Sequence, residues 1–520
     1  MRHKNKFTII IVLIVSTSVI FSACRDSHPP RKPNILFAIA DDHSFPFASA
    51  YGSELFKTPA FDEVAKRGVL FMNAFVGAPQ CSPSRAALLT GLNIWQLEEA
   101  GTHGSYFPSK FKVFTQSLES NGYATGFTGK AWGPGNWQDA GWKTNPVGTE
   151  FNDIKAESVP SKGISRTDYV ANFRAFLDAR QDDQPFFFWF GAHEPHRVYE
   201  YGSGKRHFGD KRAELPAFLP QHDSIMNDML DYAFEVSWFD QQLEMMLSIL
   251  EESGELDNTI VVVTADNGMA FPLAKANLQE YGIHVPLAIC GPGIPGGRRV
   301  QDLVSLIDLA PTFVELAGAE KMLRTTGKSL APLLKSTADG VVDTTRRFVL
   351  TGRERHTHAR PNNDGYPARA IRTHEFLYIR NFKPQLWPVG NPSPPDEPGI
   401  QGFEDIDDSP SKRVMMQNRH EWARYFEMAF AMRPQEQLYD IRKDPACIED
   451  LSSDHAYVTQ LTWLRQQLEQ ELTQQKDPRM LGTGNIFDTY PRFGRMRQFS
   501  GFRERGKYRP AAIEHITEKH

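Results

Sequence analysis

The sequence predicts an α/β protein in which a large, mostly parallel β-sheet is flanked by helices and joined by a smaller domain. Beyond a polar tether that ends near Lys32, apolar runs of strand length alternate with stretches of helical periodicity. Polar residues directly follow four of these runs. With 520 residues, the chain also exceeds what one hydrophobic core usually organises. We therefore expect a large first domain and a smaller second domain.

Polar residues gather after the four runs, and in an open α/β sheet the carboxyl ends of the strands border the ligand crevice. The runs are 34–40, 124–128, 185–190 and 259–264, followed respectively by Asp41 and Asp42, by Lys130, by His193 and His196, and by Asp266 and Asn267. We expect these four segments to converge on one site.

The C-terminal part is predicted to be a smaller α+β domain with a short antiparallel sheet. A stretch rich in Pro, Gly and Asp over 384–411 indicates a long loop. Further on, apolar residues at helical spacing predict a helix with one face against that sheet: Val458, Leu461, Leu464, Leu468 and Leu472. The predicted division is 32–375 for the large domain and 376–520 for the small one.

Composition excludes some classes of function. Hydrophobic residues at 40% and charged residues at 23% are typical of a folded globular protein. The formal net charge of -5 argues against a nucleic-acid-binding protein, and we predict no such partner. Affinity for any polyanion must come from local clusters of Lys and Arg.

The first 24 residues are typical of an export signal. A cationic start (Arg2, Lys4, Lys6) precedes an apolar stretch over 7–21 that is short for a membrane span. Its end, Ala23-Cys24, resembles a bacterial lipoprotein signal in which Cys24 is lipidated. The alternatives are a plain secretory peptide cut near Ala23 or an uncleaved anchor. We expect an exported protein, periplasmic or on the outer membrane of a Gram-negative bacterium, with a lipid anchor as its only membrane contact.

The four cysteines do not form a disulfide framework. With Cys24 and Cys81 assigned elsewhere, only Cys290 and Cys447 remain, and we expect ordinary buried thiols. A single bridge between them in an oxidising compartment is the alternative.

The segment from Cys81 to Gly91, CSPSRAALLTG, carries the strongest functional signal. Ser82 is a good N-cap and Pro83 suits the first helical position, so we expect Cys81 just ahead of a helix N-terminus. Unpaired backbone N–H groups and the helix dipole favour an anion there, and Arg85 adds a positive charge one turn in.

This segment resembles the signature of the type I sulfatases. The resemblance implies an alkaline-phosphatase-like fold and oxidation of Cys81 to formylglycine by a maturation enzyme. One hydroxyl of the hydrated aldehyde then attacks sulfur, and the other expels the bound sulfate. An unmodified serine could attack but lacks this release route.

The resemblance also implies one Ca²⁺, which suits hard oxygen ligands. Asp41, Asp42, Asp266 and Asn267 match the family's metal ligands, with the modified residue at position 81 completing the set. Taken alone, the Asp-Asp pair more often marks a turn or a helix start. Together with Asp266-Asn267 after a Val-rich strand, it predicts the metal site.

Several other residues match family positions that contact sulfate or nucleophile. Lys130 matches the family lysine, and Lys275 stands where sulfamidases carry Arg; either charge would offset the developing anion. His196 matches the histidine that protonates the leaving group. His193 either reaches substrate or packs structurally.

One departure concerns the family histidine two residues after the lysine, because Trp132 stands there. A sulfate contact is therefore missing or supplied elsewhere. His103 is the candidate substitute, with a simply solvated loop histidine as the alternative.

Among sulfatases, the chain resembles the heparan N-sulfatases most. Elements such as His193-Glu194-Pro195-His196-Arg197 and Asp266-Asn267-Gly268 with Phe271-Pro272 occur in order. The resemblance implies a glucosamine N-sulfate at the non-reducing end of heparan sulfate or heparin. The segment Gly352-Arg353-Glu354-Arg355-His356 and Arg369 could line the sugar pocket, with Glu354 as a partner for sugar hydroxyls. An exposed salt-bridged loop is the alternative. The competing functions are an exo-acting O-sulfatase on another sulfated glycan and a non-catalytic glycan-binding lipoprotein. The oligomeric state is open, with a homodimer as one option.

Overall fold

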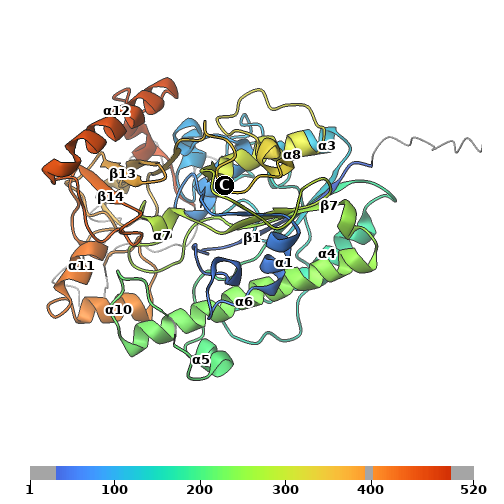
Figure 1. Ribbon diagram of the computed structural model, residues 1–520, viewed down its shortest axis with the longest axis horizontal. Helices are drawn as coiled ribbons and strands as arrows, with labels where there is room; N and C mark the ends of the chain where they lie inside the picture. The colour runs from blue at the N-terminus through green and yellow to red at the C-terminus, as the bar shows by residue number, and fades with distance from the viewer. Residues whose placement is uncertain (1–30, 213, 393–401, 494–520) are drawn as a thin grey trace, which may run out of the picture. The chain divides into compact units, whose positions relative to one another are not determined.

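The computed structural model describes residues 31–212, 214–392 and 402–493 (Figure 1). At its centre lies an eight-stranded sheet in the order β5-β4-β6-β1-β7-β8-β2-β9. Its strands are β1 (Asn34–Ala40), β2 (Val69–Phe71), β4 (Ala124–Gly129), β5 (Thr149–Glu150), β6 (Phe186–Gly191), β7 (Thr259–Ala265), β8 (Leu287–Cys290) and β9 (Arg298–Val300). All neighbours pair in parallel except β8, which is antiparallel to both β7 and β2. The prediction of a large, mostly parallel sheet is confirmed.

The four apolar runs predicted from the sequence form the contiguous middle of this sheet, β4-β6-β1-β7. Every residue of β1, β6 and β7 is buried. Strands covered on both faces need continuous apolar side chains, which explains why Phe186–Gly191 and Thr259–Ala265 show no polar alternation.

Helices cover both faces of the sheet. Figure 1 shows α6 along one side of β1 and β7, with α3 and α8 on the other side. On the first side α1 and α4 contact α6, and on the second side α2 contacts α3 and α8. The α-helices are α1 (Pro59–Arg67), α2 (Cys81–Thr90), α3 (Phe114–Ser120), α4 (Tyr169–Ala179), α5 (Ser203–Phe208), α6 (Asp223–Glu252), α7 (Glu280–Ile283), α8 (Leu309–Leu316), α9 (Ala331–Lys335), α10 (Pro410–Gln417), α11 (Ala423–Phe430) and α12 (Val458–Gln474).

Shorter elements complete the chain. A two-stranded sheet pairs β3 (Ala74–Phe75) with β10 (Val304–Ser305). The 3-10 helices are η1 (Ser49–Tyr51), η2 (Ile94–Gln96), η3 (Glu98–Gly101), η4 (Leu256–Asn258), η5 (Leu306–Asp308), η6 (Pro361–Asn363), η7 (His455–Tyr457) and η8 (Gly484–Thr489).

The predicted small antiparallel sheet is confirmed, and it has four strands in sequence order. They are β11 (Val349–Arg353), β12 (Ala368–Arg372), β13 (Phe376–Asn381) and β14 (Glu436–Asp440). This sheet begins at Val349, on the N-terminal side of residue 376. The division of the chain at residues 375 and 376 stays a prediction.

Helix α12 packs against the small sheet as predicted, contacting β12 and β13. Leu461, Leu464, Leu468 and Leu472 are buried, but Val458 is 53% exposed. Val458 was wrongly included in the buried face because it is the first residue of the helix, where the chain has not yet reached the sheet.

The predicted loop 384–411 is irregular through the part that the structure describes, except at its end. Helix α10 begins at Pro410, where the Ser409 hydroxyl accepts a hydrogen bond from the Lys412 N–H and caps the helix. The last two residues of the predicted loop are therefore helical. Asp405 in the same segment is completely buried, so the described end of this loop packs into the protein.

The predicted export signal with Cys24 lies outside the described residues. Within the described ranges, no helix is long and apolar enough to cross a membrane. Cys290 and Cys447 are buried free thiols, so the prediction of unpaired cysteines is confirmed and the alternative bridge is absent.

Candidate active site

Helix α2 brings Cys81 to the carboxyl edge of the large sheet. Cys81 is 1% exposed, and its thiol donates a hydrogen bond to Asp41 Oδ1 at 3.3 Å. The helix begins at Cys81 itself, after Gln80 as the N-cap residue. The predicted Ser82 cap is wrong, because the Ser82 hydroxyl accepts a hydrogen bond from the Gly104 N–H at 2.9 Å instead. Cys81 therefore lies in the first turn, where the positive end of the dipole still acts on it.

Three carboxylates converge on Cys81 from the ends of β1 and β7. These neighbouring parallel strands place Ala40 opposite Ala265, so the next residues, Asp41 and Asp266, come to the same edge. Single ligand atoms of Asp41, Asp42, Cys81 and Asp266 all lie within 4.8 Å of one another. The predicted convergence of the strand ends is borne out at these positions.

Each carboxylate is paired with one cation. Lys130 Nζ lies 2.6 Å from Asp41, Lys275 Nζ 2.6 Å from Asp42, and Arg85 Nε 2.7 Å from Asp266. Lys130 follows Gly129, which has a φ of +76°, and a Cβ at that position would lie 2.0 Å from the Gly191 carbonyl oxygen. Only glycine permits this turn from β4 into the site.

Burial and neighbouring charges shift the pKa values of these groups. Burial alone would raise the pKa of Asp41, but Lys130 and the other cations lower it well below its usual value. Burial and repulsion from Asp41 raise the pKa of Asp266 to about 6 in spite of Arg85. Burial and the Asp41 carboxylate raise the pKa of the Cys81 thiol well above its usual value, so the unmodified thiol is a poor nucleophile.

The donor set fits a hard dication. Asn267 Oδ1 is buried without a hydrogen-bond partner among the described residues, while its amide nitrogen donates to Asp42 Oδ1 at 2.6 Å. Carboxylate and amide oxygens are the ligands that Ca²⁺ prefers. An orphaned acceptor beside three convergent carboxylates is the arrangement expected around such an ion.

His196 borders this group, and its side chain is 33% exposed. Nδ1 lies 2.6 Å from the Arg197 carbonyl oxygen, which leaves Nε2 directed at Asp42 Oδ2 at 3.9 Å. The nitrogen facing the site is thus the one able to exchange a proton. The His193 residue is exposed nearby, with its backbone N–H bound to the Tyr169 hydroxyl.

Trp132 is 3% exposed, and its Nε1–H donates to the Ser82 carbonyl oxygen at 3.1 Å. The indole therefore packs beside the first turn of α2. His103 is also buried, not solvated, with Nδ1 3.2 Å from the His356 carbonyl oxygen. Its role as a substitute sulfate contact stays a prediction.

Glu354 and Arg369 lie in a buried ion-pair network. Both are fully buried, and Arg369 pairs with Glu354 at 2.8 Å and with Asp477 at 2.7 Å. Arg479 pairs with the other Glu354 oxygen at 2.6 Å. The alternative of an exposed loop is wrong. Since the oxygens of Glu354 are already engaged by arginines, we assign the pair a structural role beside the small sheet.

Two neighbours of the site were missed from the sequence. Asp407 Oδ2 lies 3.7 Å from Lys275 Nζ, although it comes from the loop predicted after residue 384. Gln80 precedes Cys81, is completely buried, and has no hydrogen-bond partner for either side-chain atom in the described part of the chain. The only sequence signal that could have predicted Gln80 as a neighbour of the site is its position next to Cys81.

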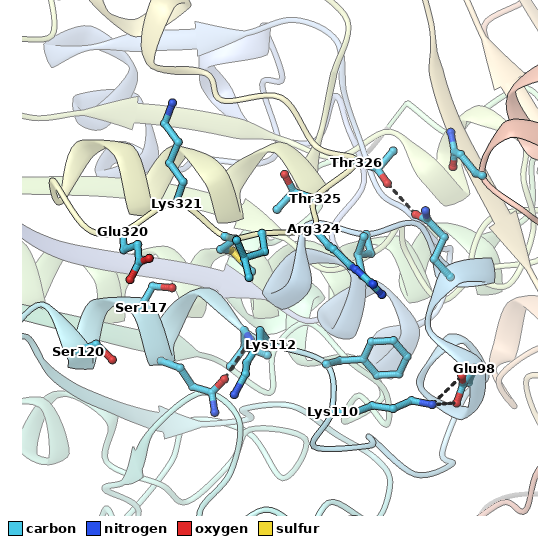
Figure 2. Close-up of a pocket in the computed structure, with 18 of the residues that line it drawn as sticks. Glu98, Lys110, Lys112, Ser117, Ser120, Glu320, Lys321, Arg324, Thr325 and Thr326 are labelled. Atoms are coloured by element: carbon cyan, nitrogen blue, oxygen red, sulfur yellow. Dashed lines mark hydrogen bonds and ion pairs between the residues drawn. The ribbon is translucent and has the colours of Figure 1, made fainter.

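A large surface cavity of about 1460 Å³ lies elsewhere, near the C-terminal end of α2 (Figure 2). It is lined by Trp95, Lys110, Lys112, Arg324 and nineteen other residues, none of which belongs to the predicted site. Figure 2 shows Lys110 directed at Glu98, with which it forms an ion pair. The cavity is therefore separate from the Cys81 centre.

The comparison with known families defines the class of protein. A family model described as Sulfatase matches residues 33–319, more than half of the chain. The chain belongs to the sulfatase family and is a hydrolase of sulfate esters or sulfamates. The matched range contains every residue of the Cys81 centre described above except Asp407.

Among its relatives, the chain is 29% identical to human N-sulphoglucosamine sulphohydrolase over 488 residues, covering 86% of this chain and 91% of the relative. It is 24% identical to an ulvan-active sulfatase of Formosa agariphila, covering 85% and 75%. A solved structure of BT4656 with its substrate D-glucosamine-2-N,6-O-disulfate has a TM-score of 0.64 at 20% identity, covering 86% of this chain and 98% of the other. That likeness confirms the alkaline-phosphatase-like fold.

Proposed function

We propose that this protein removes the N-sulfate from glucosamine at the non-reducing end of heparan sulfate or heparin fragments. The observation that carries the proposal is the buried group of Cys81, three carboxylates and Asn267 at the carboxyl edge of β1 and β7. The 29% identity to human N-sulphoglucosamine sulphohydrolase, over most of both chains, supports the N-sulfate.

Charge balance explains why this group would bind sulfate. Three carboxylates face three cations, so the protein groups alone are close to neutral. Asp41, Asp42, Asp266 and Asn267 would hold one Ca²⁺, and the ion would supply the polarisation of a sulfate oxygen. Arg85 adds a donor, because its Nη2 is buried without a partner among the described residues. A sulfate oxygen at the start of α2 would satisfy it.

The nucleophile would come from Cys81 after oxidation to formylglycine by a maturation enzyme. As a hydrate this group offers one hydroxyl to attack sulfur and a second to release the sulfate. Lys130, which contacts Asp41, and Lys275, which contacts Asp42, hold positive charge next to position 81. His196 Nε2 would give a proton to the departing amine nitrogen as the S–N bond breaks.

An O-sulfatase on another glycan is the second candidate. An N-acetylglucosamine-6-sulfatase from human is 26% identical over 385 residues, covering 59% of this chain and 65% of the relative. The Cys81 centre would serve the hydrolysis of an N-sulfate or of an O-sulfate. Trp132, which stands in place of the family histidine, is buried against α2, and the Cys81 centre beside it keeps its carboxylates and cations.

The substrate test compares sulfate release from glucosamine N-sulfate and glucosamine 6-sulfate in Ca²⁺-containing buffer. We expect release from the N-sulfate, abolished by Cys81→Ala and unchanged by Cys290→Ala, a matched buried thiol. Release from the 6-sulfate alone would favour the O-sulfatase. Release that survives Cys81→Ala would overturn the mechanism.

We also propose that the protein is exported to the periplasm or the outer membrane of a Gram-negative bacterium and lipidated at Cys24. The basic start and the Ala23-Cys24 end of the apolar stretch support this. Metabolic labelling with a palmitate analogue, with Cys24→Ala as the control, tests it.

A further inference from the structure

Two arginines share one buried carboxylate beside the small sheet, and the charge of a third, Arg433, acts on one of them. This arginine cluster consists of Arg353 at the end of β11, Arg360, Arg433, Tyr366 and Asp405. Arg353, Arg360 and Tyr366 are each 1% exposed and Asp405 is fully buried. Asp405 Oδ2 accepts from Arg353 Nη2 at 3.3 Å and from Arg360 Nη2 at 2.7 Å. Both guanidinium groups lie over the Tyr366 ring, 5.4 Å and 5.8 Å from its centroid.

Several polar atoms of the cluster have no hydrogen-bond partner in the described chain. They are Nε and Nη1 of Arg353, Nη1 of Arg360 and the Tyr366 hydroxyl. A buried donor left unpaired destabilises the folded protein. Four such atoms in one place, with no partner among the described residues, are donors and acceptors that a bound group could satisfy.

Positive charge exceeds negative charge in the cluster. Asp405 is the carboxylate that Arg353 and Arg360 share, and its Oδ1 also accepts from the Thr357 N–H and hydroxyl. Burial lowers the pKa of Arg353 to about 9; Asp405 opposes this, and Arg360 and Arg433 add to it. One carboxylate cannot compensate three guanidinium groups, so the cluster favours an additional anion.

The cluster borders the Cys81 centre on the side of Lys275. Arg433 Nη2 donates to Asn277 Oδ1 at 2.7 Å, and the Asn277 amide donates to the Lys275 carbonyl oxygen at 2.9 Å. A second connection runs through the loop that carries Asp405. Asp407, two residues further on, contacts Lys275. A sugar whose sulfate lies at Cys81 would therefore have its other substituents near this cluster.

We propose that the arginine cluster binds a second anionic group, a sulfate or a carboxylate, carried by the same substrate whose sulfate is removed at Cys81. This inference rests on the proposed function. Planar guanidinium groups bind such oxyanions through paired, charge-assisted hydrogen bonds, and the unpartnered atoms of Arg353 and Arg360 provide the donors. The substrate would then be a sugar with at least two anionic groups.

The test measures binding by calorimetry in the Cys81→Ala background with Ca²⁺, so that no turnover is needed. Glucosamine N-sulfate is compared with glucosamine N,6-disulfate, and an N-sulfoglucosamine–uronic acid disaccharide is compared with its carboxyl-reduced form. We expect the ligand with the second anion to bind about 10- to 100-fold more tightly in at least one pair, as charge-assisted hydrogen bonds predict.

Arg433→Gln is the main variant, because it removes one charge while the two arginines that pair with Asp405 remain. This substitution should reduce the difference in affinity between the two ligands of a pair to within about threefold. It should leave the affinity for glucosamine N-sulfate unchanged. Arg353→Lys keeps the positive charge but loses the planar guanidinium group. It should reduce the preference for the ligand with the second anion in part. The matched control is Arg413→Gln, an exposed arginine paired with Asp408.

Equal affinity within both ligand pairs would overturn the inference, since internal water would then be what completes the cluster. Equal weakening of all four ligands by Arg433→Gln would also overturn it, because the role of Arg433 would then be structural. Failure of the proposed function looks different: the Cys81 enzyme would release no sulfate, whatever the binding preference.

Discussion

At the residue scale, the centre pairs each acidic side chain with a basic one. Asp41, Asp42 and Asp266 would be costly to bury together without Lys130, Lys275 and Arg85, because like charges in a low dielectric repel strongly. The candidate metal-ligand set is therefore balanced in charge by the protein itself, without an ion. A bound dication then adds two positive charges at the place where a sulfate would bind.

The ligands at the ends of β1 and β7 could be predicted because their positions follow from strand ends. The sequence also names Lys130, Lys275 and Arg85 as site residues. It does not show which carboxylate each of them contacts, since Lys275 and Asp42 are 233 residues apart. The same limit applies to Trp132, whose indole bonds the Ser82 carbonyl, and to Glu354, whose partner Arg479 lies 125 residues on. A pattern of residue types does not contain these pairings.

His196→Gln tests the proton donor. Loss of a general acid costs about 10²–10⁴-fold in rate when the leaving group needs a proton. We expect a loss of this size on glucosamine N-sulfate but a much smaller one on 4-nitrophenyl sulfate, whose phenolate leaves unaided. Initial rates on both substrates measure the difference, with His455→Gln, an exposed histidine at the start of η7, as the control.

An equal loss on both substrates would contradict the proton-donor role of His196. It would indicate that the imidazole only helps to hold the sulfate.

At the scale of elements, the start of α2 shows where local rules fail. Ser82 and Pro83 are good capping residues, yet the helix starts one residue earlier than they indicate. The reason is tertiary, because the Ser82 hydroxyl binds the backbone of Gly104 in the loop after η3. Strand positions were predicted more accurately, since four runs of apolar residues match β1, β4, β6 and β7 to within one residue at each end.

A buried ion pair links the small sheet to α7, which lies between β7 and β8 in the sequence. Arg372 of β12 contacts Glu280 of α7, and both are at most 5% exposed. Burial alone would raise the pKa of Glu280, but Arg372 and His284 lower it to about 2. Because the unfolded value is about 4.3, the pair contributes about 3 kcal/mol of stability that is present above pH 4 and lost as the pH falls toward 2.

Glu280→Gln should therefore lower the free energy of unfolding by about 3–5 kcal/mol at pH 7, because it leaves Arg372 buried without its partner. The difference from wild type should shrink below pH 4. Denaturant unfolding at several pH values measures this, with the half-exposed Glu63→Gln as the control. A difference that stays constant down to pH 2 would contradict the account of this ion pair.

At the scale of the molecule, one hydrophobic core runs through both sheets. It includes residues of β1 and β7 together with Leu377 of β13 and Leu464 of α12. The sequence indicates a second domain by length and composition, but a shared core leaves no polar linker to mark where it starts. The small sheet accordingly begins at Val349, inside the range predicted for the large domain.

Calcium should couple the centre to the stability of the whole protein. An ion that binds only the folded state stabilises it by about 2.7 kcal/mol at a hundredfold excess over its dissociation constant. We expect Ca²⁺ to raise the melting temperature of the metal-free protein, and Asp266→Asn to remove most of that increase. Differential scanning calorimetry with EDTA and with added Ca²⁺ measures the shift.

Asp257→Asn is the control for this comparison, because its carboxylate is at the surface. An equal calcium-dependent shift in Asp266→Asn and wild type would place the ion elsewhere.

The most direct test is the mass of the tryptic peptide Gly68–Arg85 in protein purified from its native host. Conversion of Cys81 to formylglycine replaces sulfur by oxygen with loss of two hydrogens, so the account predicts an aldehyde peptide that is lighter than the thiol form. A peptide that carries only the intact thiol, in protein that still releases sulfate, would contradict it.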